Sequence, residues 1–190
     1  HDVVLAAGST GKHYAQIQHG APFDVFLAAD VERPKLLEEK GETVSGSRFT
    51  YAIGSVVLWS PKKGFADYEG DVLRQGNFKR LAMANPKLAP YGKAAQQILE
   101  SHDLWELMRH QIVQGENIAQ TFQFISSGNA ELGFVSLSQI MQPGRTLPGS
   151  FAKFESSIYD PVEQQAVLLS KSTAAQEFLD FLRGGEGRKV

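Results

Sequence analysis

An α/β fold is predicted for this chain of 190 residues. Short apolar runs typical of strands alternate with segments whose apolar residues recur at helical spacing, which favours a sheet with mostly parallel strands. The nearly continuous apolar run Phe23–Ala28 indicates a buried parallel strand. Hydrophobic residues make up 42% of the chain, enough for a sizeable core, and no apolar run reaches the 18 residues that would predict a membrane-spanning helix.

Seven strands are predicted where apolar and β-branched residues cluster between glycine, proline or asparagine. They are Val3–Ala6, Phe23–Ala28, Thr50–Ser60 with an interruption at Gly54, Arg80–Ala84, Gln111–Val113, Leu132–Val135 and Ala166–Leu169.

Helices are predicted between these strands from their capping residues and apolar faces. They cover Lys12–His19, the segment from Asp30 to Gly41, a segment opened by Pro90, Asp103–His110, the segment from Glu116 to Gly128, and one opened by a capping box at Thr173–Gln176. The Pro90 helix is expected to bury Ala94, Ala95, Ile98 and Leu99.

Composition excludes several classes of function. A formal net charge of −2 argues against nonspecific binding of nucleic acid. The absence of cysteine excludes disulfides, cysteine-ligated zinc and cysteine nucleophiles. The five histidines show no metal-binding spacing, and there is no nucleophile elbow, P-loop or dinucleotide fingerprint. We therefore expect neither a metal site nor an enzyme, with His13 on a solvated helix face and Trp59 as a packing residue.

Three turns share one feature, since each joins a strand to a helix through small or polar residues. They are Gly8–Gly11, Ala89–Gly92 and Gly115–Ile118. The start of a helix has unpaired backbone N–H groups and a partial positive charge, so it can bind an anion. Every α/β domain contains such turns, so the three become informative only if the fold directs them to one ligand.

The phrases around these turns resemble those of a known family. "GSTGKHYAQIQHGAPFDVFLAAD", "ANPKLAPYGKAAQQIL", "GENIAQTFQFISSGNAELGFV" and "YDPVEQQAVLLSKS" look like periplasmic substrate-binding proteins of ABC transporters, and most closely those that bind molybdate or tungstate. The resemblance implies a two-lobed venus flytrap fold with two crossover hinge strands and the ligand in the cleft between the lobes. Lobe I would comprise residues 1–50 and 161–190, and lobe II residues 51–160.

The resemblance also implies the binding residues. The family's hydroxyl donor falls on Thr10, beside Ser9 and Gly11, and two backbone donors fall on Tyr91 and on Ile118, next to Asn117. Some members use a tyrosine hydroxyl where this chain has Ser136. The oxyanion would be held by hydrogen bonds, without a cofactor or a direct metal contact.

One departure from the family concerns the chain ends. The family begins with a further strand whose turn supplies another donor, and that strand and its helix are missing here. We therefore expect a sequence trimmed at both ends, with the first strand of lobe I and one ligand contact absent.

The expected function is capture of molybdate or tungstate for delivery to the membrane subunits of an ABC transporter. The protein would act as a monomer in the periplasm, or outside the cell and attached to the membrane where no outer membrane exists. Alternatives are a binding protein for another oxyanion, such as sulfate or phosphate, the effector-binding domain of a transcription regulator, and, third, an enzyme.

Overall fold

The computed structural model describes residues 3–66, 70–141, 144, 148–185 and 187. The chain forms two compact units. Unit 1 contains the described residues up to Ile53 and from Glu163 onward, and unit 2 extends from Gly54 to Val162. The chain passes between the units twice, within strands β2 (Phe49–Gly54) and β8 (Val162–Leu168). Residues 1–2 and 188–190, which belong to the predicted lobe I, lie outside the described part.

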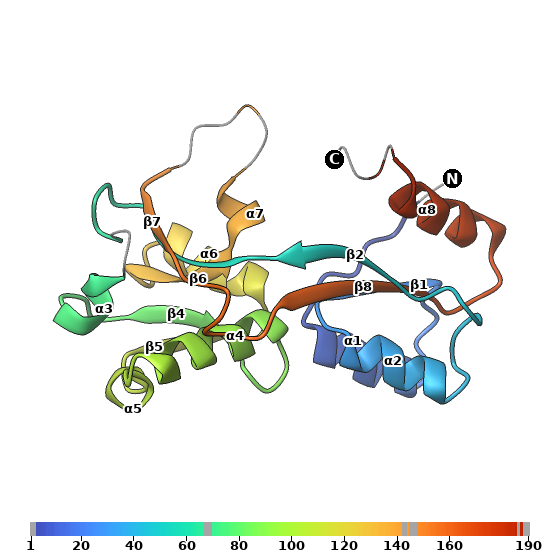
Figure 1. The fold of residues 1–190 in the computed structure, drawn as a ribbon, viewed down its shortest axis with the longest axis horizontal. Helices are drawn as coiled ribbons and strands as arrows, with labels where there is room; N and C mark the ends of the chain where they lie inside the picture. The colour runs from blue at the N-terminus through green and yellow to red at the C-terminus, as the bar shows by residue number, and fades with distance from the viewer. Residues whose placement is uncertain (1–2, 67–69, 142–143, 145–147, 186, 188–190) are drawn as a thin grey trace. The chain divides into compact units, whose positions relative to one another are not determined.

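Unit 1 is built on a three-stranded sheet in the order β1-β8-β2, where β1 is Val25–Ala28. Helices α1 (Thr10–Gln18) and α2 (Glu32–Glu39) pack on one face, and α8 (Thr173–Arg183) packs on the other (Figure 1). Strand β1 runs antiparallel to β8, so the prediction of a parallel strand is wrong here. Its partner comes from the far end of the chain, and the alternation of local elements cannot indicate that strand's direction.

The predicted strand Val3–Ala6 does not form. A strand requires a neighbour to satisfy its backbone N–H and C=O groups, and no described strand pairs with this segment. Its side chains are also open to solvent, with Val3, Val4 and Leu5 exposed to 68%, 94% and 84%.

Unit 2 is built on a five-stranded sheet in the order β5-β4-β6-β3-β7. The strands are β3 (Val56–Ser60), β4 (Leu81–Ala84), β5 (Ile112–Gly115), β6 (Leu132–Ser136) and β7 (Ser150–Lys153). Strand β4 is parallel to β5 and β6, whereas β3 is antiparallel to β6 and β7. The sheet is therefore mixed, with the predicted parallel pairing confirmed at its β5-β4-β6 side.

Helices cover both faces of this sheet. They are α3 (Asp71–Gln75), α4 (Pro90–Ser101), α5 (Trp105–Met108), α6 (Ile118–Ser126) and α7 (Leu137–Ile140). In Figure 1, α4 and α5 lie on one side of β4, and α6 and α7 lie on the other.

The core of unit 2 confirms two predictions. The α4 side chains Ala94, Ala95, Ile98 and Leu99 are all at most 2% exposed. Trp59 is a packing residue, because its ring stacks on Phe122 at 5.0 Å and its Nε1 donates to the Pro148 carbonyl at 2.7 Å.

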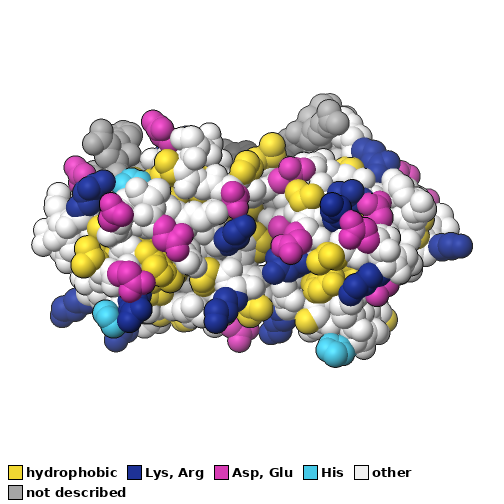
Figure 2. All heavy atoms as spheres, turned by 60° about the horizontal axis from the view of Figure 1, so that its bottom comes forward, with side chains coloured by type: hydrophobic (Ala, Val, Ile, Leu, Met, Phe, Trp, Pro, Cys, Tyr) yellow, Lys and Arg dark blue, Asp and Glu magenta, His cyan; other side chains and the backbone are white. Residues whose placement is uncertain are grey.

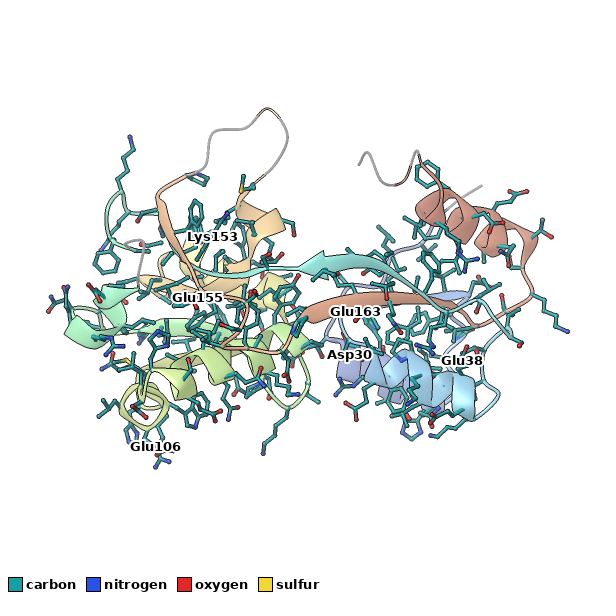
Figure 3. All side chains as sticks on the ribbon, in the orientation of Figure 1. Asp30, Glu38, Glu106, Lys153, Glu155 and Glu163 are labelled. Carbon is teal, nitrogen blue, oxygen red and sulfur yellow. The ribbon has the colours of Figure 1, made fainter. Side chains whose placement is uncertain are left out.

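Helix ends follow local chemistry, with two corrections. Val31 and not the predicted Asp30 is the residue directly before α2, although the Asp30 carboxylate accepts a hydrogen bond from the Arg33 N–H at 3.0 Å. Figure 3 shows Asp30 and Glu38 toward opposite ends of α2. The capping box predicted at Thr173 is wrong, because Ser172 precedes the helix and accepts from the Ala175 N–H at 3.4 Å. Either hydroxyl could cap a helix, and the sequence pattern alone favoured the wrong one of the two neighbours.

Candidate anion-binding site

The turn before α1 is the predicted site of unit 1. Ser9 stands at the N-cap with extended backbone, yet its side chain does not cap the helix. Its hydroxyl is buried and has no hydrogen-bond partner. The first N–H groups of the helix, from Thr10 and Gly11, have no acceptor within the helix either. A buried hydroxyl and backbone donors are thus left together at the positive end of a helix, where an anion is favoured.

Thr10 makes the second hydroxyl of this turn. Its side chain is 5% exposed, and its Oγ1 accepts a hydrogen bond from the Ala29 N–H at 3.0 Å. Ala29 directly follows strand β1, so this bond ties the start of α1 to the end of the strand. Because a hydroxyl that accepts a bond still has its own proton to give, Thr10 remains able to donate to a ligand.

His13 is half-buried, so the prediction of a solvated helix face holds for one edge of its ring only. Its ring lies edge-on to Phe23 at 5.8 Å, its Nδ1 is 2.9 Å from the Gln16 side-chain oxygen, and its Nε2 is buried without a partner. A Cβ atom at Gly8 would lie 2.7 Å from that Nε2, so a side chain there would require the ring to move. The sequence contains a signal that His13 lies near Ser9, because residues four apart share a helix face.

In unit 2, the parallel strands bring the predicted residues to one edge of the sheet. Strands β4, β5 and β6 all end there, and Ala84 is paired with Gly115. The Asn85 N–H also donates to the Gly115 carbonyl at 2.8 Å. Helix α4 follows β4, α6 follows β5, and Ser136 ends β6, so their starts meet at the carboxyl edge where ligands bind in open α/β sheets.

Glycine allows the two helix starts to approach the strand ends. A Cβ atom at Gly92, in the first turn of α4, would lie 2.3 Å from the Ala84 carbonyl oxygen. One at Gly115 would lie 2.8 Å from the Thr121 Oγ1 in α6. Neither contact is sterically tolerable. Both positions therefore require glycine while α4 lies this close to the end of β4 and α6 this close to the end of β5.

Tyr91 carries the first backbone N–H of α4, because Pro90 has none. Its side chain is 7% exposed, and burial raises the pKa of its hydroxyl above the ordinary range; a hydrogen bond with Ser136 opposes this rise, and the nearby Tyr159 adds to it. Tyr91 therefore stays neutral at physiological pH and does not repel an anion.

At the start of α6, the Asn117 side chain caps the helix. Its Oδ1 accepts from the Gln120 N–H at 2.9 Å, and its backbone carbonyl accepts from Thr121 Oγ1 at 3.0 Å. These bonds fix the first turn and leave the Ile118 and Ala119 N–H groups without an acceptor inside the helix. The first turns of α1, α4 and α6 contain no acidic residue.

Ser136 and Gln139 connect the start of α4 with the start of α6. The Ser136 hydroxyl bonds with Tyr91 and lies 2.6 Å from the Ser138 hydroxyl. The Ser136 N–H donates to Gln139 Oε1 at 3.0 Å, and Gln139 Nε2 donates to the Ile118 carbonyl at 3.1 Å. Gln139 was missed by the sequence analysis, although the pattern Ser-x-x-Gln at 136–139 is that of a capping box.

The predicted residues thus form two groups, one in each unit. Ser9, Thr10 and Gly11 share one turn of unit 1, whereas Tyr91, Asn117, Ile118 and Ser136 share one sheet edge of unit 2. Within the described ranges, no three histidine, aspartate or glutamate residues are grouped to hold a metal ion. Nor does any described helix have the length and apolar character needed to cross a membrane.

Comparison with known proteins relates this arrangement to a family. Residues 1–190 match the family described as bacterial extracellular solute-binding protein. The molybdate-binding protein ModA of Azotobacter vinelandii is 49% identical over the whole chain, which covers 77% of that protein, and ModA of Rhodobacter capsulatus is 41% identical, with 75% covered. The solved Azotobacter vinelandii periplasmic molybdate-binding protein superposes with a TM-score of 0.94 at 40% identity, over 98% of this chain and 83% of that one. This similarity confirms the predicted two-lobed class of fold, and the chain belongs to the bacterial extracellular solute-binding protein family.

Proposed function

We propose that this protein binds molybdate and acts as the solute-binding component of an ABC transporter. The observation that carries the proposal is 49% identity, across the whole chain, to a protein named for molybdate binding. The relatives are binding proteins, and the function is accordingly capture of a ligand and not catalysis.

The donors to the oxyanion would come from both units. In unit 1, the Ser9 and Thr10 hydroxyls and the Gly11 N–H would donate. In unit 2, the Tyr91 and Ile118 N–H groups would donate, with Asn117 and Ser136 beside them. Support for this assignment comes from the unpartnered Ser9 hydroxyl and from the meeting of α4 and α6 at one sheet edge.

Neutral donors suit a tetrahedral dianion. N–H groups and hydroxyls at helix starts bind a charged oxygen strongly, at about 1.5–3 kcal/mol for each hydrogen bond. They require no buried cation, whose desolvation would be costly when the site is empty. The neutral state of Tyr91 fits this scheme, because a phenolate would repel the ligand.

Several finer features belong to the same proposal. Tungstate, which resembles molybdate in charge and shape, would bind as well. The protein would be a periplasmic monomer that delivers its ligand to the membrane subunits of the transporter and does not bind nucleic acid. On the face drawn in Figure 2, lysine and arginine lie among aspartate and glutamate within each unit, so that face offers no continuous basic patch.

Calorimetric titration of the full-length protein with molybdate, tungstate, sulfate and phosphate tests the proposal. We expect molybdate and tungstate to bind much more tightly than sulfate or phosphate. Tighter binding of sulfate or phosphate would instead support the alternative of another oxyanion.

A further inference from the structure

One side chain joins two of the proposed donor turns. The Gln139 amide accepts from the Ser136 N–H at 3.0 Å and donates to the Ile118 carbonyl at 3.1 Å. Both groups of the amide are therefore engaged. The bridge connects the start of α7 with the start of α6, 21 residues earlier in the chain.

The contact with Ile118 fixes the first peptide plane of α6. The Ile118 carbonyl and the Ala119 N–H belong to one planar peptide group, in which they point in opposite directions. A hydrogen bond that holds the carbonyl therefore also fixes the direction of the Ala119 N–H and restricts that of the neighbouring Ile118 N–H. These are the N–H groups that the helix itself leaves without an acceptor.

The other end of the bridge leads to α4. Ser136 receives the Gln139 bond at its backbone and bonds with the Tyr91 hydroxyl through its side chain. Tyr91 is 7% exposed and packed at the start of α4. A continuous chain of contacts, Tyr91–Ser136–Gln139–Ile118, thus spans the two helix starts within unit 2.

We propose that Gln139 is a positioning residue that fixes the separation of the donors from α4 and α6 and thereby makes the site select molybdate against the smaller sulfate. This inference rests on the proposed function. Donors held at a fixed separation fit one ionic radius, and a smaller ion leaves some of them poorly paired. Donors released from the bridge can move inward around the smaller ion, so selectivity falls even where binding persists.

The test compares Gln139→Met with wild type. Methionine keeps the length and helix compatibility of the side chain and removes both hydrogen bonds. Gln139→Glu is the second variant, because it retains an acceptor for Ser136 N–H and loses the donor to Ile118. Its added negative charge acts on both dianions and therefore largely cancels in the ratio of their Kd values. The matched control is Gln96→Met on α4, where the glutamine bonds with Glu100 at 2.7 Å, apart from this chain of contacts.

The measured quantity is the ratio of the Kd for sulfate to the Kd for molybdate, determined by calorimetry on the full-length protein. A general loss of structure weakens the binding of both ions alike and leaves the ratio unchanged. A change in the ratio therefore reports on the positions of the donors. We expect it to fall about tenfold in both Gln139 variants, the factor that corresponds to about 1.4 kcal/mol, and to stay unchanged in Gln96→Met. An unchanged ratio in the Gln139 variants would overturn the inference alone, whereas a wild-type protein that binds neither ion would contradict the proposed function itself.

Discussion

The Ala29 N–H donates to the Thr10 hydroxyl oxygen at 3.0 Å, whereas the neighbouring Ser9 hydroxyl is buried and has no partner. These two adjacent hydroxyls therefore differ in their contribution to the stability of the ligand-free protein. Thr10 stabilises the turn by accepting a backbone bond, and Ser9 makes no such bond. Substitution of each should separate folding from binding.

For Thr10→Ala, we expect weaker molybdate binding by roughly one to two decades and a fall in unfolding free energy of about 1 kcal/mol, because the Ala29 N–H loses its acceptor. Thr10→Ser should retain most of the molybdate affinity and most of the unfolding free energy. Calorimetry and urea unfolding measure the two quantities. Unchanged affinity in the alanine variant would mean that Thr10 is only a turn residue.

For Ser9→Ala, we expect a similar loss of affinity without a loss of stability in the ligand-free protein. The hydroxyl has no partner to lose in that state, and its removal relieves an unsatisfied buried group. Thermal melts with and without molybdate report both effects. A variant that melts lower without ligand and binds normally would show that Ser9 has a structural role only.

Gly92→Ala tests the close approach of α4 to strand β4. The added Cβ would lie 2.3 Å from the Ala84 carbonyl oxygen, so the helix start must move, at a cost of about 1–3 kcal/mol in unfolding free energy. Molybdate affinity should fall too, because Tyr91 moves with the turn. Gly185→Ala is the control, since a Cβ there meets nothing within 4 Å. Equal urea midpoints for the two variants would contradict this reading of the turn.

Much of the local structure could be predicted from sequence, because it depends on short-range signals. Pro90 and the apolar spacing of α4 predicted a helix that the structure confirms. Partners distant in the chain could not be predicted in this way. Val25–Ala28 reads as a parallel strand, yet it pairs antiparallel with a strand from the end of the chain. Val3–Ala6 reads as a strand, yet no strand among the described residues pairs with it.

The same distinction applies to the site. Small and polar residues before a helix predicted the turns at Gly8, Ala89 and Gly115. The bond from Gln139 to Ile118 joins two residues that are 21 positions apart in the chain, and only the fold reveals it. The surroundings of His13 also depend on a tertiary contact, because its ring lies edge-on to Phe23.

Tyr91→Phe should alter stability at alkaline pH. Burial raises the pKa of the folded-state hydroxyl above the ordinary value of 10.0, so folding favours the neutral form. The resulting stability is fully present below pH 10 and is lost as pH rises through the folded-state pKa. Above about pH 10, wild type should therefore lose unfolding free energy relative to Tyr91→Phe, which has no hydroxyl to ionise. A pH-independent difference in urea melts up to pH 11 would contradict the assignment.

Asp160→Asn tests an exposed contact that fixes the chain to α4 just before strand β8. Asp160 Oδ2 accepts from Lys93 Nζ at 2.8 Å and from Gln97 Nε2 at 2.9 Å, and the Lys93 bond lowers the pKa of the carboxyl. Its contribution is present above the ordinary value of 3.8 and is lost as pH falls through the lowered folded-state pKa. Since both side chains are exposed, we expect a loss of less than about 1 kcal/mol at pH 7 that vanishes in acid and diminishes in high salt. A difference that persists unchanged in acid and in salt would mean that the ion pair is not its source.

Binding of molybdate is the central claim, and competition calorimetry of the full-length protein tests it most directly. Sulfate is first titrated alone to give its own Kd, and molybdate is then titrated into the sulfate-saturated protein, so that the displacement gives the Kd of molybdate relative to that of sulfate. We expect molybdate to displace sulfate with at least a tenfold advantage, a difference of about 1.4 kcal/mol or more. Heat of binding for sulfate with no displacement by molybdate would contradict the claim.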